Sequence, residues 1–118
     1  MTQKDIFLEI AVSIKNIMPA EEQFIEAVLN IMRLTGTVEF TGYYIDERNN
    51  KKWLDIFNIK LDSSYIHELY QLTQTLPPVH INWNRANFTL YSDNKISIEY
   101  IWDEVLQNEV DNYNNKTT

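Results

Sequence analysis

Five acidic side chains near the end of the sequence are the residues best suited to chemistry with a partner. Glu99, Asp103, Glu104, Glu109 and Asp111 fall within 13 residues that contain no lysine or arginine. Carboxylates at this density can form charge-assisted hydrogen bonds with arginines and lysines of another molecule. A structural role is the alternative, because Asp103 and Glu104 also suit the positive N-terminal end of a helix. The sequence leaves both interpretations open.

Patterns typical of catalysis or metal binding do not occur in this sequence. His67 and His80 match no zinc-binding spacing, and Ser63-Ser64 lacks the Gly-x-Ser-x-Gly context of a hydrolase nucleophile. With no cysteine and only two glycines, the chain offers neither thiolate ligands nor a glycine-rich loop to cradle phosphate. The prediction is a protein without catalytic residues, cofactor or metal, whose function is binding.

Aromatic side chains are the second group of candidate contacts. The chain is 13% aromatic, and one small core cannot hold every ring. We expect Trp53 and Trp83 in the core, and one of Tyr43 and Tyr44 facing outward, because neighbours on a strand point to opposite sides. The complete set of predicted partner-binding residues is Tyr43, Tyr44, Asp46, Glu99, Trp102, Asp103 and Glu104.

Length and charge limit the class of protein further. The 118 residues suit one domain, predicted over 4–111, followed by a disordered polar tail over 112–118. The net charge of −7 argues against nucleic acid and against an anionic membrane surface as partners. No apolar run is long enough to span a membrane, and residues 1–5 do not resemble a signal peptide. Together with the lack of cysteine, these features predict a cytoplasmic protein; they say nothing of its oligomeric state.

An amphipathic helix is predicted at the start of the chain. Thr2 is a candidate N-cap, and Pro19 ends the helix because it disfavours helical geometry at Met18. Apolar residues recur at steps of three and four, which is the spacing of one helix face. These residues are Ile6, Phe7, Ile10, Ile14, Ile17 and Met18.

Residues 23–34 fit two templates. A strand would place one alternating set on a single face, namely Ile25, Ala27, Leu29 and Ile31. A helix would stack a different set, namely Phe24, Val28, Ile31 and Met32. Pro19 before this segment and Gly36 after it suit a helix, so local rules favour the helix slightly.

The rest of the chain alternates between strand and helix patterns. Residues 37–45 are rich in β-branched and aromatic types, 46–50 form a polar turn, and 52–57 read as a return strand. Asp62 or Ser63 can cap a second helix that Pro77-Pro78 ends, with apolar members Ile66, Leu69, Tyr70 and 72–76. A hairpin follows, with Phe88 and Leu90 before a turn at 92–94 and an alternating strand at 96–100. A short helix over 102–110 closes the pattern.

This order predicts an α+β domain. Connections of hairpin length make the strands antiparallel, so the expected sheet is a meander of hairpins with the helices packed on one face. The N-terminal amphipathic helix is part of that helical layer.

Four features, in order over residues 6–104, carry a resemblance to a known family. They are the helix ending in Met18-Pro19 before Glu21-Glu22; a strand pair joined near Gly36 with Val38-Glu39-Phe40 and Tyr43-Tyr44; Trp53-Leu54-Asp55-Ile56 leading to a helix with Glu68-Leu69-Tyr70; and Trp83 before a hairpin with Phe88-Thr89-Leu90, Asp93-Asn94-Lys95 and Glu99-Tyr100. In this order they resemble the YezG-like immunity proteins, the antitoxin partners of bacterial polymorphic toxins.

The resemblance implies a strand for residues 23–34 and a specific function. Members of such a family bind a cognate toxin domain and neutralise it, and such toxins are often nucleases. A nuclease has a basic groove for phosphate, so an acidic inhibitor would associate with it quickly, and buried aromatics would hold the complex. The expected partner is therefore a basic toxin domain, blocked by stoichiometric occlusion. The alternatives are a general protein-interaction or adaptor domain without a toxin partner, and a small-ligand binding domain.

Overall fold

The computed structural model describes residues 1–75 and 82–116, with only the backbone described for 114–116. The elements follow the chain as α1 (Gln3–Ile17), β1 (Phe24–Leu34), β2 (Thr37–Asp46), β3 (Lys51–Trp53), the short 3-10 helix η1 (Ile56–Asn58), α2 (Ser63–Thr75), β4 (Arg85–Tyr91), β5 (Ile96–Ile101) and α3 (Glu104–Lys116). This is the predicted α+β class, with an N-terminal helix and an antiparallel sheet.

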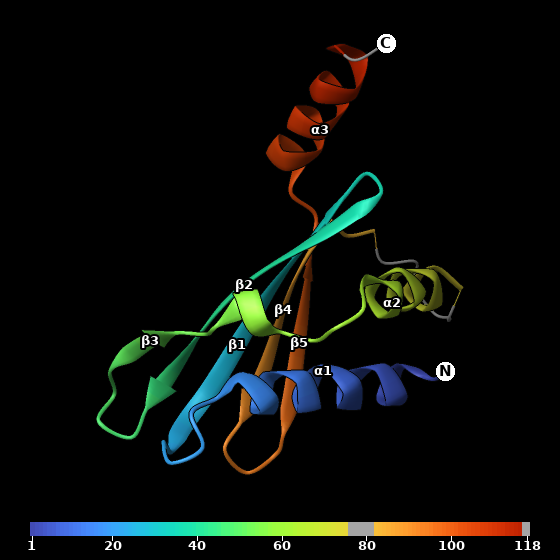
Figure 1. The fold of residues 1–118 in the computed structure, drawn as a ribbon. Coiled ribbons are helices and arrows are strands. Elements are labelled where there is room, and N and C mark those ends of the chain that lie inside the picture. The colour runs from blue at the N-terminus through green and yellow to red at the C-terminus, as the bar shows by residue number, and fades with distance from the viewer. Residues whose placement is uncertain (76–81, 117–118) are drawn as a thin grey trace.

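The five strands form one sheet in the order β3-β2-β1-β4-β5 (Figure 1). All four pairings are antiparallel. Three turn residues have the left-handed backbone that tight turns need: Gly36 at φ 76°, Asn49 at φ 66° and Asn94 at φ 68°. Glycine and asparagine adopt this conformation at the lowest cost, which is why the chain reverses at these points.

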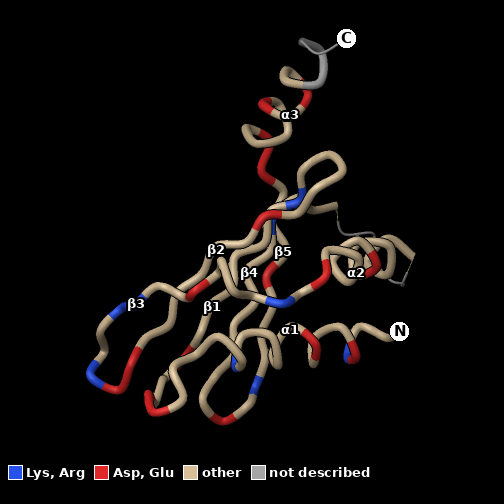
Figure 2. Tube along the Cα trace, in the orientation of Figure 1, with Lys and Arg blue, Asp and Glu red and all other residues tan. Residues whose placement is uncertain are grey.

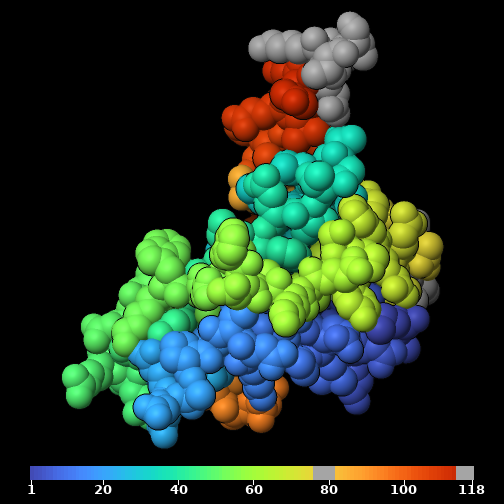
Figure 3. All heavy atoms as spheres, in the orientation of Figure 1, coloured from blue at the N-terminus to red at the C-terminus, as the bar shows by residue number. Residues whose placement is uncertain are grey.

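Helices α1 and α2 cover one face of the sheet and form the core with it (Figures 1 and 3). Ile6, Ile10 and Ile14 of α1 and Ile66 and Leu69 of α2 are fully buried. The sheet supplies alternate residues of its central strands: Ala27, Leu29, Ile31, Ala86, Phe88 and Leu90. Apolar side chains on one stripe of each helix and one face of the sheet therefore meet in a single layer.

Helix α1 begins and ends where the sequence predicts. The Thr2 hydroxyl accepts a hydrogen bond from the Asp5 N–H at 3.2 Å, and the Asp5 carboxylate accepts one from the Thr2 N–H at 2.9 Å. This reciprocal pair satisfies two backbone donors at the helix start. At the other end Met18 has extended backbone, as expected before Pro19.

Residues 24–34 are a strand, which confirms the strand prediction over the helix that local rules favoured. Ala27, Leu29 and Ile31 are buried on one face as predicted. Ile25 does not join them and is exposed, because the pairing with β2 shifts register between Phe24 and Glu26. A bulge of this kind moves a side chain off its expected face.

Trp53 lies on a different face of the sheet from the one predicted. The prediction of a buried Trp53 in a strand over 52–57 is wrong: β3 ends at Trp53, and this side chain is 73% exposed. The cause is register, because Trp53 pairs with Tyr43 and shares its face of the sheet. That face is not the one covered by α1 and α2. The next residue, Leu54, takes the buried position instead.

The remaining elements agree with the prediction in part. Trp83 is fully buried, as expected, and its indole N–H donates to the Thr73 hydroxyl at 2.9 Å. Asp62 caps α2 by accepting a hydrogen bond from the Ser64 N–H at 2.9 Å. The predicted stop at Pro77-Pro78 lies outside the described residues. Helix α3 starts at Glu104 and runs to Lys116, across most of the segment assigned to a polar tail.

Candidate functional site

The second face of the sheet, which we call the open face, has no helix beside it among the described residues except α3, which lies at one end (Figure 1). Cross-strand neighbours line up there in four rows. The rows are Lys51, Ile45, Glu26 and Tyr91; Trp53, Tyr43, Val28, Thr89 and Ser97; Thr41, Asn30, Asn87 and Glu99; and Glu39, Met32, Arg85 and Ile101. Side chains directly opposite each other on paired strands lie close enough to act together. The open face is therefore a continuous surface of mixed polar, aromatic and acidic character.

The β3 end of the open face is aromatic. Lys51 Nζ lies 4.3 Å from the centroid of the Tyr43 ring and 4.8 Å from that of Trp53. A cation over an aromatic face is held by the ring quadrupole, so the lysine orders both rings at the sheet edge. Large exposed aromatics of this kind are the side chains that most often anchor protein interfaces.

The other end of the open face is acidic. Glu39 and Glu99 are exposed on β2 and β5, and α3 adds Glu104 and Glu109. Within residues 1–75 and 82–113, none of these four makes an ion pair. Figure 2 shows the acidic positions of α3 above the sheet. Unpaired carboxylates on neighbouring elements add up to a negative field that attracts a basic surface.

Asp103 holds α3 in place at this acidic end. Its Oδ1 accepts a hydrogen bond from the Leu106 N–H at 3.0 Å, and its Oδ2 accepts one from Arg85 Nε at 2.6 Å. The buried Asn84 amide pairs with the Asp103 backbone, donating to its carbonyl and accepting from its N–H, both at 2.7 Å. The Leu106 N–H and then Arg85 lower the pKa of Asp103 below its ordinary value. Asp103 therefore acts as the cap and anchor of α3.

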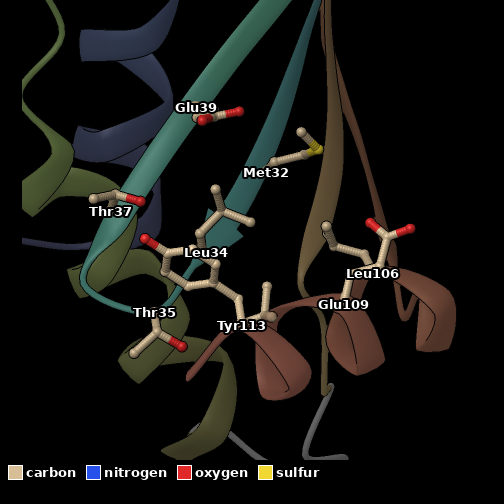
Figure 4. Close-up of a pocket in the computed structure, with 9 residues that line it drawn as sticks. Met32, Leu34, Thr35, Thr37, Glu39, Leu106, Glu109 and Tyr113 are labelled. Atoms are coloured by element: carbon tan, nitrogen blue, oxygen red, sulfur yellow. The ribbon is translucent and has the colours of Figure 1, made fainter. Parts of the chain in front are cut away.

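A groove of about 440 Å³ separates α3 from the β1–β2 end of the open face. Figure 4 shows strand residues on one wall and helix residues on the other. Its apolar lining consists of Met32, Leu34, Leu106, Val110 and Tyr113. Leu106, Val110 and Tyr113 lie at steps of four and three, so they share one side of α3. Glu39 and Glu109 also line the groove, one from each wall.

Two of the predicted contact residues lie away from the open face. Tyr44 is buried under the helical layer, and its hydroxyl donates to the Glu22 carboxylate at 2.5 Å. Asp46 is also buried, and its Oδ1 accepts from the Arg48 and Asn50 N–H groups at 3.0 and 2.8 Å. These hydrogen bonds shape the 46–50 turn, and they lower the pKa of Asp46 together with Lys52. Tyr44 and Asp46 therefore make hydrogen bonds within the fold and do not belong to the open face.

The structure brings other predicted residues together. Tyr43 and Glu99 are both on the open face, one row apart, which confirms that one of the two neighbouring tyrosines faces away from the core. Trp102 is 45% exposed just before α3, and Glu104 is exposed in its first turn. Asp103 lies beside them in its capping role.

Sequence reasoning missed Glu39, Trp53 and Tyr113. Glu39 and Tyr43 alternate on β2 with the partly buried Phe40, so period-two spacing alone could have assigned Glu39 to the open face. The exposure of Trp53 follows once its pairing with Tyr43 across the 46–50 turn is known. Tyr113 carried no signal, because the predicted helix ended at Val110.

Other kinds of site find no geometric support in the parts of the chain that the structure describes. There, no three metal-binding side chains of the His, Cys, Asp or Glu type converge. His67 is exposed on α2, and His80 lies outside the described residues. None of the helices in these same parts combines the length and apolar character needed to cross a bilayer.

Comparison with known proteins adds no assignment: no protein-family model matches the chain, and no curated protein matches it.

Proposed function

We propose that this chain is a cytoplasmic immunity protein that binds a bacterial toxin domain and neutralises it by occluding its active site or substrate groove. The proposal rests on the four features that resemble the YezG-like family. The single structural observation that supports it is the open face, with exposed Trp53 at one end. Toward the other end lie Glu39 and Glu99, which make no ion pair among the described residues. Such a surface suits a protein partner of positive charge.

The aromatic and the acidic residues of this surface have different roles in binding. Trp53 and Tyr43 present large, rigid apolar area, which releases water when a partner covers it and slows dissociation. The carboxylates affect association, which precedes these contacts: they raise the rate at which a basic partner arrives in the correct orientation. These carboxylates are Glu39, Glu99 and Glu104. Binding of this kind requires no cofactor.

Rescue of growth is the first test. The C-terminal domain encoded by the gene directly upstream is expressed in bacteria with and without this protein, and the purified pair is titrated by calorimetry. We expect toxicity that this chain relieves, and 1:1 binding with Kd below about 10 nM, or about −11 kcal/mol. A toxic domain that is neither bound nor relieved would contradict the proposal and leave an adaptor domain as the better description.

The contact surface is tested in the same assay. Trp53→Ala removes an exposed anchor of the open face, while Val12→Ala truncates an exposed residue on the outer side of α1. We expect the first change to weaken toxin binding at least tenfold and the second to leave it within twofold. Equal effects would mean that the toxin does not bind at the open face.

A further inference from the structure

The groove between α3 and the open face is apolar inside and acidic on both walls. Leu34 on β1 faces Tyr113 on α3 (Figure 4), Val110 lines the same groove, and Tyr113 remains 70% exposed. A volume of about 440 Å³ lies within the range of cavities that accept ligands. An open apolar groove of this size leaves area that a partner can bury.

Charge restricts what the groove can accept. Glu39 and Glu109 line opposite walls, and among the described residues neither makes an ion pair. Arg85, the basic residue in the same row as Glu39, is engaged by Asp103. The resulting negative potential opposes fatty acids and phosphates and favours cationic groups. The occupant that fits is apolar in its centre and basic at its flanks.

We propose that the groove seats an amphipathic, basic helix of the toxin domain, with a large apolar side chain packed against Leu34 and Tyr113. Lysines or arginines one turn away on that helix pair with Glu39 and Glu109. The partner's identity rests on the proposed function, whereas the chemistry of its binding segment rests on the groove. The 13 residues of α3 span about 20 Å, which is the length of three to four turns of a helix laid alongside it in the groove.

The apolar contact is tested with a matched pair of substitutions on α3. Tyr113 lines the groove and Val105 does not, yet their exposures are 70% and 69%. Tyr113→Ala and Val105→Ala both introduce the best helix former, so neither weakens α3 itself. We expect Tyr113→Ala to weaken binding of the toxin domain about tenfold and Val105→Ala to change it less than twofold. Equal effects of the two changes would overturn the assignment.

The charged contact is tested with a second matched pair. Glu109→Gln removes a carboxylate of the groove, and Glu104→Gln removes one from the same helix outside the groove. Both lower the negative field and slow association similarly. Only Glu109→Gln is expected to raise the dissociation rate, about fivefold, because a direct ion pair is lost. Identical dissociation rates for the two variants would contradict the pairing.

A probe that does not depend on the toxin keeps the two proposals separable. A peptide of about 18 residues built from leucine and lysine forms an amphipathic basic helix, and its glutamate counterpart forms an acidic one. Titrated into the labelled full chain, the basic peptide is expected to shift the amide NMR signals of Met32, Leu34 and Tyr113, and the acidic peptide is not. If this holds but the upstream domain does not bind, the proposed function fails and the groove assignment stands.

Three outcomes of that titration overturn the groove assignment. Shifts of equal size with both peptides would mean that charge does not select the occupant. Stronger shifts with octanoate than with the basic peptide would assign the groove to an apolar small molecule. Self-association in the ultracentrifuge that Tyr113→Ala abolishes would assign it to a second copy of this chain.

Discussion

Arg85 Nε donates a hydrogen bond to Asp103 Oδ2 across 2.6 Å, and this pair ties the start of α3 to strand β4. The other oxygen of the same carboxylate caps α3 through the Leu106 N–H. One side chain thus connects the helix with the sheet, and it sets the position of one wall of the groove. Asp103 therefore has a structural role at the start of α3, whereas Glu104 is exposed and makes no ion pair among the described residues.

The first prediction concerns the pH dependence of stability at Asp103. Its pKa is lowered from the ordinary value of 3.8, so its ionised form is favoured in the folded state. The stabilisation is fully present above the unfolded pKa and is lost as pH falls through the lower folded pKa. We expect Asp103→Asn to be less stable than wild type at pH 7, and the difference to shrink below about pH 4. Urea unfolding across this range measures it, with Asp111→Asn on the same helix as the control.

The second prediction contrasts two tryptophans. Trp83→Ala opens a cavity in the core and removes the indole N–H that donates to the Thr73 hydroxyl, so we expect a loss of about 3–5 kcal/mol in the free energy of unfolding. Trp53→Ala removes an exposed ring, and we expect a change within about 0.5 kcal/mol. Urea unfolding of both variants checks the contrast. A large loss for Trp53→Ala would indicate a structural role that its exposure does not reveal.

The third prediction concerns Arg33, whose guanidinium lies 3.5 Å from the centroid of the Tyr70 ring and 5.1 Å from that of Trp83. It donates to the Trp83 carbonyl at 2.6 Å, and burial lowers its pKa. Lysine cannot reproduce this planar stacking, so we expect Arg33→Lys to lower the free energy of unfolding by about 1–3 kcal/mol. Arg33→Met removes the partly buried charge and puts an apolar side chain in its place, and we expect it to cost less. Thermal and urea unfolding distinguish these outcomes; a lysine variant as stable as wild type would refute the argument.

The fourth prediction tests electrostatic attraction by the open face. Replacing both Glu39 and Glu99 with glutamine is expected to slow association with the toxin domain about 3- to 10-fold at low salt, a part of the acceleration that steering provides. The control is Glu9→Gln, an exposed acid on α1 in the helical layer. Stopped-flow association at low and high salt measures the effect, which should disappear when salt screens the charges. If Glu9→Gln slows association equally, only net charge matters and the open face has no special role.

Local signals determined much of the secondary structure. Thr2 and Pro19 mark the ends of α1, Asp62 marks the start of α2, and Asn94 marks the last hairpin turn. These signals depend on a residue's own backbone preferences and on hydrogen bonds to near neighbours, so they can be predicted from a few adjacent residues. The burial of Trp83 was predicted as well, but the same expectation failed for Trp53, so the size and apolar character of a tryptophan do not decide its burial.

Tertiary pairing decided what local patterns left open. Strand β1 is buried between β2 and β4, and its central position overrides a sequence that local rules assigned to a helix. The register of β3 against β2 turns Trp53 to the open face, and the shift near Phe24 turns Ile25 out of the core. The sequence shows that these residues are apolar, but only strand pairing determines the face on which each one lies.

For the candidate site too, the sequence determined some properties and the tertiary structure determined others. The sequence by itself determined that the chain is acidic, rich in aromatic residues and without a recognisable catalytic pattern. Only the tertiary structure separated Tyr43 on the open face from the buried Tyr44 and Asp46. It alone placed Glu39 and Glu109 on two walls of one groove, since they come from elements about 70 residues apart. A groove is formed by distant segments that pack together, and no local pattern records that packing.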